Sequence, residues 1–241
     1  MKASPWTAGS AHSLVTGEDD ADLGGEESAW PGHEGCGPRC WREVHRAWTP
    51  QDGVRFRVLF VCTANICRSP LAERLTRAAL GPCPAVQVTS AGTHARPGTE
   101  MDGHTGRTLA RLGGDPTGFR ASLLTPEMVA GADLVLTATR AHRAESVALH
   151  LAAATRAFTI AEFGALARAV PPEEVVRHRD PVRRACALVD EARALRGLVR
   201  VGGPDIADPY RRSRLAHRMA GRRVARALAV PLRLFTHLPE S

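Results

Sequence analysis

A cysteine and an arginine six residues apart, Cys62 and Arg68, are the side chains of this chain best suited to phosphate chemistry. A thiolate is a strong nucleophile, and a guanidinium presents a planar fork of donors that matches two phosphoryl oxygens. The spacing alone is weak evidence, because Cys36 and Cys40 are also followed by arginine six residues later. What distinguishes the pair at Cys62 is the sequence around it.

That surrounding sequence predicts a strand, a tight loop and a helix. The apolar run at 58–61 is typical of a buried strand and ends at Cys62. Ser69 followed by Pro70 predicts the N-cap and first position of a helix. A loop between a strand and a helix N-terminus binds anions through its amides and the helix dipole. The loop residues that would present these amides are Thr63, Ala64, Asn65, Ile66 and Cys67.

Three segments together resemble one known family. The stretch C-T-A-N-I-C-R-S from Cys62 resembles the C-x5-R-S loop of the low-molecular-weight protein tyrosine phosphatases. Residues 89–93 (T-S-A-G-T) resemble the family's S-A-G-T segment, and residues 208–210 (D-P-Y) resemble its acid-bearing motif. The three occur in the family's order, and the resemblance covers about residues 54–230.

The resemblance implies an enzyme that hydrolyses phosphotyrosine through a phosphocysteine intermediate. Cys62 would be the nucleophile, Arg68 would hold the phosphate, and Asp208 would be the general acid and base. Asp205 is the alternative acid. The resemblance further implies that Ser69 donates to the thiolate, that Ser90 joins a network with Asn65, and that Tyr210 flanks the pocket.

Three loop positions raise separate questions. Ala64 stands where the family usually has glycine, and a positive φ there would cost about 1 kcal/mol. Ile66 stands where the related arginine-phosphate phosphatases have threonine, and an apolar side chain suits an aryl phosphate better. Cys67 either fills the loop or bonds to Cys62 under oxidation.

Other functions on the same fold remain open. One is an arginine-phosphate phosphatase, and another is a thiol-dependent arsenate reductase, whose relay needs a further pair of cysteines. Only Cys83 and Cys186 follow the loop, and they are far apart in sequence. A silent phosphate-binding module is a third possibility, but binding alone requires neither a nucleophile nor an acid.

Alternating strand and helix patterns predict an α/β fold. We expect a four-stranded parallel doubly wound sheet with helices on both faces and the phosphate-binding loop after the first strand. The expected strands are 58–61, 86–88, 133–137 and 156–159. The expected helices are 101–112, 126–130, 140–152, 161–169, 183–198 and 212–229.

The domain prediction has three parts. Residues 1–53 are rich in glycine, serine and acidic residues and predict a disordered extension. Residues 54–230 form the phosphatase-like domain, with an inserted segment at about 171–204, and 231–241 form a C-terminal tail. The spacing of the possible metal ligands in the extension fits no usual zinc pattern, so we expect neither a metal nor a cofactor; these ligands are His33, Cys36, Cys40 and His45.

Charge and composition limit the partners. The net charge is +7, and because residues 1–53 carry −5, the remainder carries +12. The arginines are scattered and the chain has one tyrosine, which does not favour nucleic-acid binding. We find no apolar run long enough for a membrane span and no signal-peptide pattern. The expected partner is a tyrosine-phosphorylated protein, and the expected location is the cytoplasm.

Overall fold

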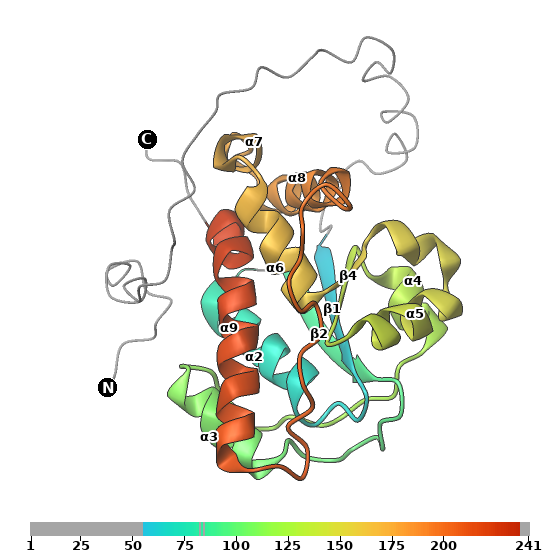
Figure 1. Ribbon diagram of the computed structural model, residues 1–241, viewed down its shortest axis with the longest axis vertical. Helices are drawn as coiled ribbons and strands as arrows, with labels where there is room; N and C mark the ends of the chain where they lie inside the picture. The colour runs from blue at the N-terminus through green and yellow to red at the C-terminus, as the bar shows by residue number, and fades with distance from the viewer. Residues whose placement is uncertain (1–54, 82, 84, 237–241) are drawn as a thin grey trace. The chain divides into compact units, whose positions relative to one another are not determined.

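A computed structural model of the chain describes residues 55–81, 83 and 85–236 (Figure 1). The predicted extension at 1–53, with its possible metal ligands, lies outside the described residues. None of the helices in the described ranges has the length and apolar character needed to cross a membrane.

A four-stranded parallel sheet forms the centre of the described chain, as predicted. Its strand order is β2-β1-β3-β4, so the first strand lies between the second and third. Ligands of such sheets bind beyond the carboxyl end of the strands where this order reverses, which here is the end of β1. The strands are β1 (Phe56–Cys62), β2 (Val86–Gly92), β3 (Leu134–Thr137) and β4 (Ala157–Thr159).

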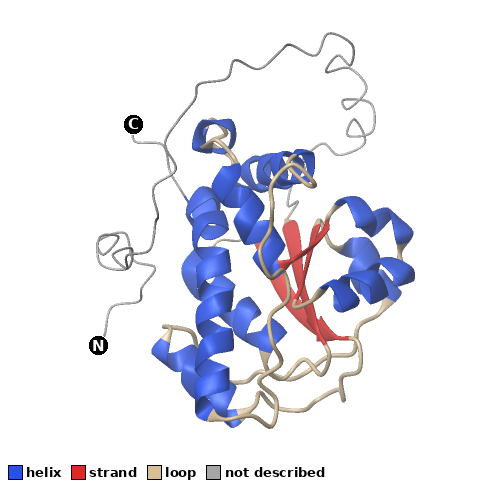
Figure 2. Cartoon of the chain, viewed as in Figure 1, coloured by secondary structure: helices blue, strands red, loops and turns tan. Residues whose placement is uncertain are grey.

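Helices cover both faces of the sheet (Figures 1 and 2). Helices α2, α6 and α9 lie on one face, with α3 packed against α2 and α9, and α4 and α5 lie on the other. The bounds are α2 (Arg68–Leu80), α3 (Gly103–Arg111), α4 (Pro126–Gly131), α5 (Arg140–Leu149), the short 3₁₀ helix η1 (Leu151–Thr155), α6 (Ile160–Ala169) and α9 (Arg214–Thr236).

The apolar side chains of the central strand β1 explain why helices pack on both faces of the sheet. Leu59 and Val61 are buried in one apolar cluster with Val129 of α4. Because successive side chains of a strand point to opposite faces, Val58 and Phe60 face the helices on the other side, where they are also buried. A strand that is apolar on both faces is stable only between two layers of helices.

The segment 171–204 contains two helices, α7 (Pro172–Val176) and α8 (Pro181–Ala194). Arg184 of α8 is 1% exposed. Its Nε and Nη2 donate to the Phe235 carbonyl at 3.2 and 2.9 Å. This arginine therefore ties α8 to the last turn of α9, where backbone carbonyls lack partners within the helix.

The closing helix is longer than the sequence pattern predicted. α9 continues through Thr236, so residues 231–236 belong to it and not to a C-terminal tail. The apolar side chains Leu232, Leu234 and Phe235 are all buried. Their burial stabilises the helix beyond Pro231, which alone would favour an earlier end.

Candidate active site

The loop 63–67 connects β1 directly to α2, which begins at Arg68 with Cys67 as its N-cap. The predicted cap at Ser69 is wrong, because this residue lies inside the first turn and no side chain caps the helix. The Ser69 hydroxyl instead lies 3.0 Å from the Cys62 Sγ, where both atoms are buried. The tight loop starts the helix early and turns this hydroxyl toward the thiol.

Asn65 holds the loop in shape. It has a φ of 54°, and its Nδ2 donates to the hydroxyls of Ser69 at 2.9 Å and Ser90 at 2.8 Å. Its Oδ1 accepts from the Ser122 backbone N–H at 2.8 Å. Ala64 is not among the residues with positive φ, so the strain foreseen there is absent. Asparagine tolerates this conformation better than alanine because its short polar side chain bonds locally.

Ser90 extends this network to a buried carboxyl group. Its hydroxyl donates to Glu73 Oε2 at 2.5 Å. Burial raises the pKa of Glu73, although Ser90 and Arg77 oppose that shift. Glu73 of α2 thus supports the loop indirectly, through Ser90 and Asn65. Nothing in the local sequence distinguished this glutamate from a surface residue.

Gly92 also belongs to the site, although the sequence alone gave no indication of its role. A Cβ placed on it would lie 2.4 Å from the Thr63 carbonyl oxygen and 2.8 Å from the Asn65 backbone nitrogen. Both atoms are backbone atoms and cannot rotate away. Only glycine lets the end of β2 pack this closely against the loop.

Arg68 lies at the rim of the loop and is 5% exposed. Its Nη1 donates to the Ile206 carbonyl at 3.1 Å, and its Nη2 lies 3.0 Å from the Asp208 Oδ2. Its Nε is buried and has no hydrogen-bond partner among the described residues. Because an unpaired buried donor is costly, this atom is suited to an anion in the loop.

The two candidate acids have different surroundings. Asp208 pairs with Arg68, and its side chain is half exposed. Asp205 accepts a hydrogen bond from the Arg140 backbone N–H at 2.8 Å, and its carboxylate forms an ion pair with the Arg140 guanidinium at 3.2 Å. Asp205 therefore serves the N-terminus of α5, whereas Asp208 lies beside the loop.

Thr63 and His142 form a hydrogen-bond chain that ends at Arg68. The Thr63 Oγ1 lies 3.3 Å from the Arg68 Nη2 and 2.9 Å from the His142 Nε2. The His142 Nδ1 lies 2.7 Å from the Thr139 Oγ1. Arg68 has no acceptor, so it donates to Thr63, whereas the direction of the bonds from Thr63 and Thr139 to the imidazole depends on the tautomer of His142.

The surroundings of His142 favour its neutral form. Burial, and then the charge of Arg68, lower the pKa of His142 below its ordinary 6.5. A lone histidine at the start of a predicted helix gave no signal of this role.

The two residues proposed for substrate contact lie at the surface. Ile66 is partly exposed, and its carbonyl accepts from the Asp102 backbone N–H at 3.0 Å. Tyr210 is 44% exposed. The Arg211 guanidinium lies 5.3 Å from the centre of the Tyr210 ring, in a cation–π contact.

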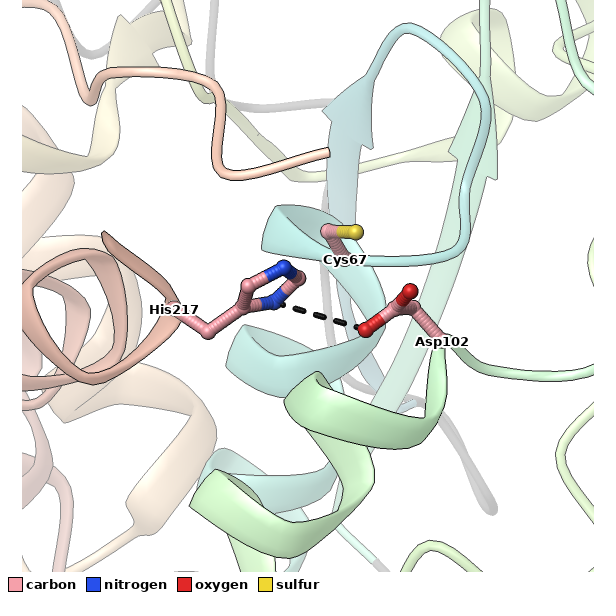
Figure 3. Close-up of side chains that lie close together, drawn as sticks. All are labelled: Cys67, Asp102 and His217. Carbon is pink, nitrogen blue, oxygen red and sulfur yellow. Dashed lines mark ion pairs between the residues drawn. The ribbon is translucent and has the colours of Figure 1, made fainter. Parts of the chain in front are cut away.

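Cys67 points away from solvent into a cluster with Asp102 and His217 (Figure 3). The possible metal-ligand atoms of these three residues lie within 4.8 Å of one another. No other group of three or more His, Cys, Asp or Glu side chains among the described residues is arranged in this way. Hydrogen bonds already engage two members of the cluster: Asp102 Oδ1 accepts two backbone N–H groups as the N-cap of α3, and the His217 Nδ1 lies 2.9 Å from the Thr105 Oγ1. Burial raises the pKa of Cys67 to about 12, so this thiol stays protonated. Both Cys62 and Cys67 are free.

Comparisons with known proteins agree with this geometry. The model of the family described as low molecular weight phosphotyrosine protein phosphatase matches residues 57–171. The chain is 34% identical over 135 residues to a probable low molecular weight protein-tyrosine-phosphatase, EpsP, of Ralstonia nicotianae, covering 56% of this chain and 84% of that one. It is 36% identical over 108 residues to a protein-arginine-phosphatase of Geobacillus stearothermophilus, covering 45% of this chain and 71% of that one.

A solved structure shares the fold. The tyrosine phosphatase AmsI of Erwinia amylovora superimposes with a TM-score of 0.54 over 76% of this chain and 94% of its own, at 22% identity. The identity to EpsP over most of that protein's length is sufficient to assign the family. The chain belongs to the low molecular weight protein-tyrosine phosphatases, a family of phosphoric monoester hydrolases.

Proposed function

We propose that this protein hydrolyses phosphotyrosine in proteins through a covalent phosphocysteine at Cys62. The observation that carries the proposal is the buried Nε of Arg68, which has no partner among the described residues and lies at the rim of a loop with a thiol at its floor. A phosphoryl group in the loop would give this donor its acceptor. The loop amides would stabilise the charge on the equatorial oxygens.

In the first step the Cys62 thiolate attacks phosphorus. The S–P bond forms while the bond from phosphorus to the phenolic oxygen breaks, and Asp208 donates a proton to that oxygen. Tyrosine leaves as a neutral phenol. The Ser69 hydroxyl at 3.0 Å from the sulfur stabilises the thiolate before the attack.

In the second step water attacks the phosphocysteine. The Asp208 carboxylate takes a proton from the water, the new P–O bond forms, and the S–P bond breaks. Inorganic phosphate leaves, and the thiolate and the protonated acid are restored. Arg68 stays bound to the phosphoryl oxygens through both steps, while its contact with Ile206 holds it in place.

Ile66 and Tyr210 support phosphotyrosine as the substrate. An aryl ring is flat and apolar, so Ile66 and Tyr210 could each cover a face of it, whereas a phosphoguanidine carries N–H groups along the same length. Against Ile66 these groups would lose water without gaining a partner, at roughly 1–3 kcal/mol each. A threonine at this position would supply a hydroxyl.

Phosphoarginine is the second candidate substrate, because the relative from Geobacillus stearothermophilus is named a protein-arginine-phosphatase. We expect kcat/KM for phosphotyrosine peptides to exceed that for matched phosphoarginine peptides by about tenfold or more. Ile66→Thr should narrow or reverse the preference. Equal or better turnover of phosphoarginine by the wild type would overturn the assignment and leave the cysteine chemistry intact.

An arsenate reductase relay is not favoured by the remaining thiols. Burial raises the pKa of Cys186 to about 12, and a protonated thiol is a poor nucleophile. The described cysteines are all free, and Cys62 must be reduced to act, so we expect the protein to work in a reducing compartment such as the cytoplasm.

The cysteine chemistry is tested by Cys62→Ser. This variant should lose turnover of p-nitrophenyl phosphate and of phosphotyrosine peptides but still bind inorganic phosphate. Cys186→Ser is the matched control, since it removes a partly buried thiol outside the loop, and it should keep full activity. Hydrolysis by Cys62→Ser at a rate near that of the wild type would contradict the mechanism.

A further inference from the structure

An open hollow of about 250 Å³ lies between α3 and the first turn of α9. Four of the five residues that line it carry nitrogen donors, and none is acidic. The lining consists of His104, Arg107, Thr108, Arg111 and Arg214.

The three arginines of the hollow are exposed and unpaired within the described part of the chain. No described carboxylate lies within ion-pair distance of Arg107, Arg111 or Arg214, whereas Arg77 and Arg143 each pair with a glutamate at 3.0 Å. Arg107 and Arg111 are four residues apart and so lie on one face of α3, where like charges repel. An anion in the hollow would relieve that repulsion.

His104 adds a further donor. The Arg107 Nη2 lies 2.7 Å from the His104 Nδ1. Because a guanidinium cannot accept a hydrogen bond, Nδ1 must accept, and the imidazole proton is therefore on Nε2. The hollow thus presents guanidinium forks and an N–H group, a set suited to phosphoryl or carboxylate oxygens.

The start of α3, which lines the hollow, also contacts the phosphate-binding loop. The His104 ring lies 5.3 Å from that of His217, which belongs to the cluster with Cys67. Asp102, the N-cap of α3, donates its backbone N–H to the Ile66 carbonyl. Figure 1 shows α3 and the start of α9 at the end of the sheet from which the loop emerges.

We propose that this hollow binds a second anionic group of the phosphoprotein substrate, carried near the phosphotyrosine that enters the Cys62 loop. The ligand is a phosphoryl or carboxylate group on the same peptide. The proposal rests on the proposed phosphotyrosine hydrolysis. It adds that the enzyme selects tyrosines in acidic or multiply phosphorylated segments.

The test compares peptides that carry one phosphotyrosine and either a second phosphotyrosine, a glutamate or a glutamine at successive positions on either side. With the full-length wild type, we expect an anionic neighbour at a favourable position to raise kcat/KM by about tenfold, mainly through KM. The gain should shrink as salt is raised, since exposed charges are screened. Comparison of the peptides with a second phosphotyrosine and those with a glutamate shows whether the hollow prefers a phosphoryl or a carboxylate group.

The variant Arg107→Gln/Arg111→Gln/Arg214→Gln should lose this preference while keeping its melting temperature. Its kcat/KM for p-nitrophenyl phosphate should be unchanged, because that small substrate reaches only the loop. The matched control is Arg168→Gln/Arg183→Gln/Arg200→Gln, which removes three exposed arginines of α6, α8 and the segment after it. The control should retain the preference.

The proposal is overturned if the first variant keeps the preference, if the control loses it equally, or if the wild type shows none at any position. Failure of the proposed function has a different signature, namely no turnover of the singly phosphorylated peptide or of p-nitrophenyl phosphate. In that case, binding of the same peptides to Cys62→Ser still tests the hollow, since the affinity should depend on the three arginines.

Discussion

Arg68 is the residue at which the contacts of the loop converge. Its guanidinium reaches Ile206, Asp208 and Thr63, and through Thr63 it is linked to His142. These partners come from three separate parts of the chain. The orientation of the phosphate-binding fork therefore depends on groups far apart in the sequence, among which Thr63 and His142 carry out no chemistry themselves.

Asp208→Asn should lower kcat by about 10²–10⁴ for substrates with poor leaving groups, because the variant cannot protonate the departing oxygen. The loss should be smaller for aryl phosphates whose leaving group needs no proton. Kinetics across a series of substituted phenyl phosphates measures both effects. Asp205→Asn is the control, since its carboxylate caps α5; if only this variant shows the leaving-group dependence, Asp205 is the acid.

His142→Gln should reduce kcat/KM by about five- to tenfold, the equivalent of one hydrogen bond. The loss arises because Thr63 no longer has a fixed hydrogen-bond partner in His142 and so positions Arg68 less well. Thr63→Val breaks the same chain, so the double variant should be little worse than either single one. Steady-state kinetics of the four proteins provides the test, and additive losses would mean that the two residues act separately.

At the scale of elements, the site depends on how closely β2 approaches the loop after β1. The two strands run in register from Phe56 opposite Val86 to Cys62 opposite Gly92. The nucleophile and the glycine therefore end their strands side by side. The loop then folds over Gly92, which leaves no room for a side chain.

Gly92→Ala should destabilise the protein by about 1–3 kcal/mol and impair turnover, because the added methyl group meets backbone atoms of Thr63 and Asn65. Urea unfolding and p-nitrophenyl phosphate kinetics measure the two effects. Gly202→Ala is a matched control, since a Cβ there has no atom within 4 Å and should change neither quantity. An unaltered stability of Gly92→Ala would show that the loop yields more readily than its packing indicates.

At the scale of the whole molecule, two buried histidines make stability depend on pH. Burial lowers the pKa of both His142 and His217 below the ordinary value of 6.5. Below that pH the unfolded chain takes up protons that the folded chain does not, so the free energy of unfolding falls as the solution is acidified. The two groups lie on α5 and α9, and each bonds to a residue from another element.

The midpoint of urea unfolding should therefore decrease between about pH 7.5 and about pH 5.5. The variant His142→Gln/His217→Gln should show a weaker dependence, even if it is less stable at the higher pH. Equilibrium unfolding monitored at both pH values provides the comparison. An equal decrease in the variant would assign the effect to other groups.

The sequence by itself determined the features that depend on neighbouring residues. The strand at 58–61, the loop and the following helix are contiguous, so a single stretch defined the spacing of Cys62 and Arg68 and the amides between them. The alternation of strands and helices likewise defined the parallel sheet. These features are local, because hydrophobic period and turn residues act over a few positions.

Only the tertiary structure decided which distant groups meet the loop. The partner of Thr63 is 79 residues away, and the carbonyl that holds Arg68 is 138 residues away. No local pattern encodes such contacts, which is why His142 was missed and why Asp205 remained an alternative to Asp208. The prediction that Ser69 caps the helix was wrong for the same reason. Its hydroxyl contacts Cys62 and Asn65, and these contacts depend on packing that is absent from the isolated helix.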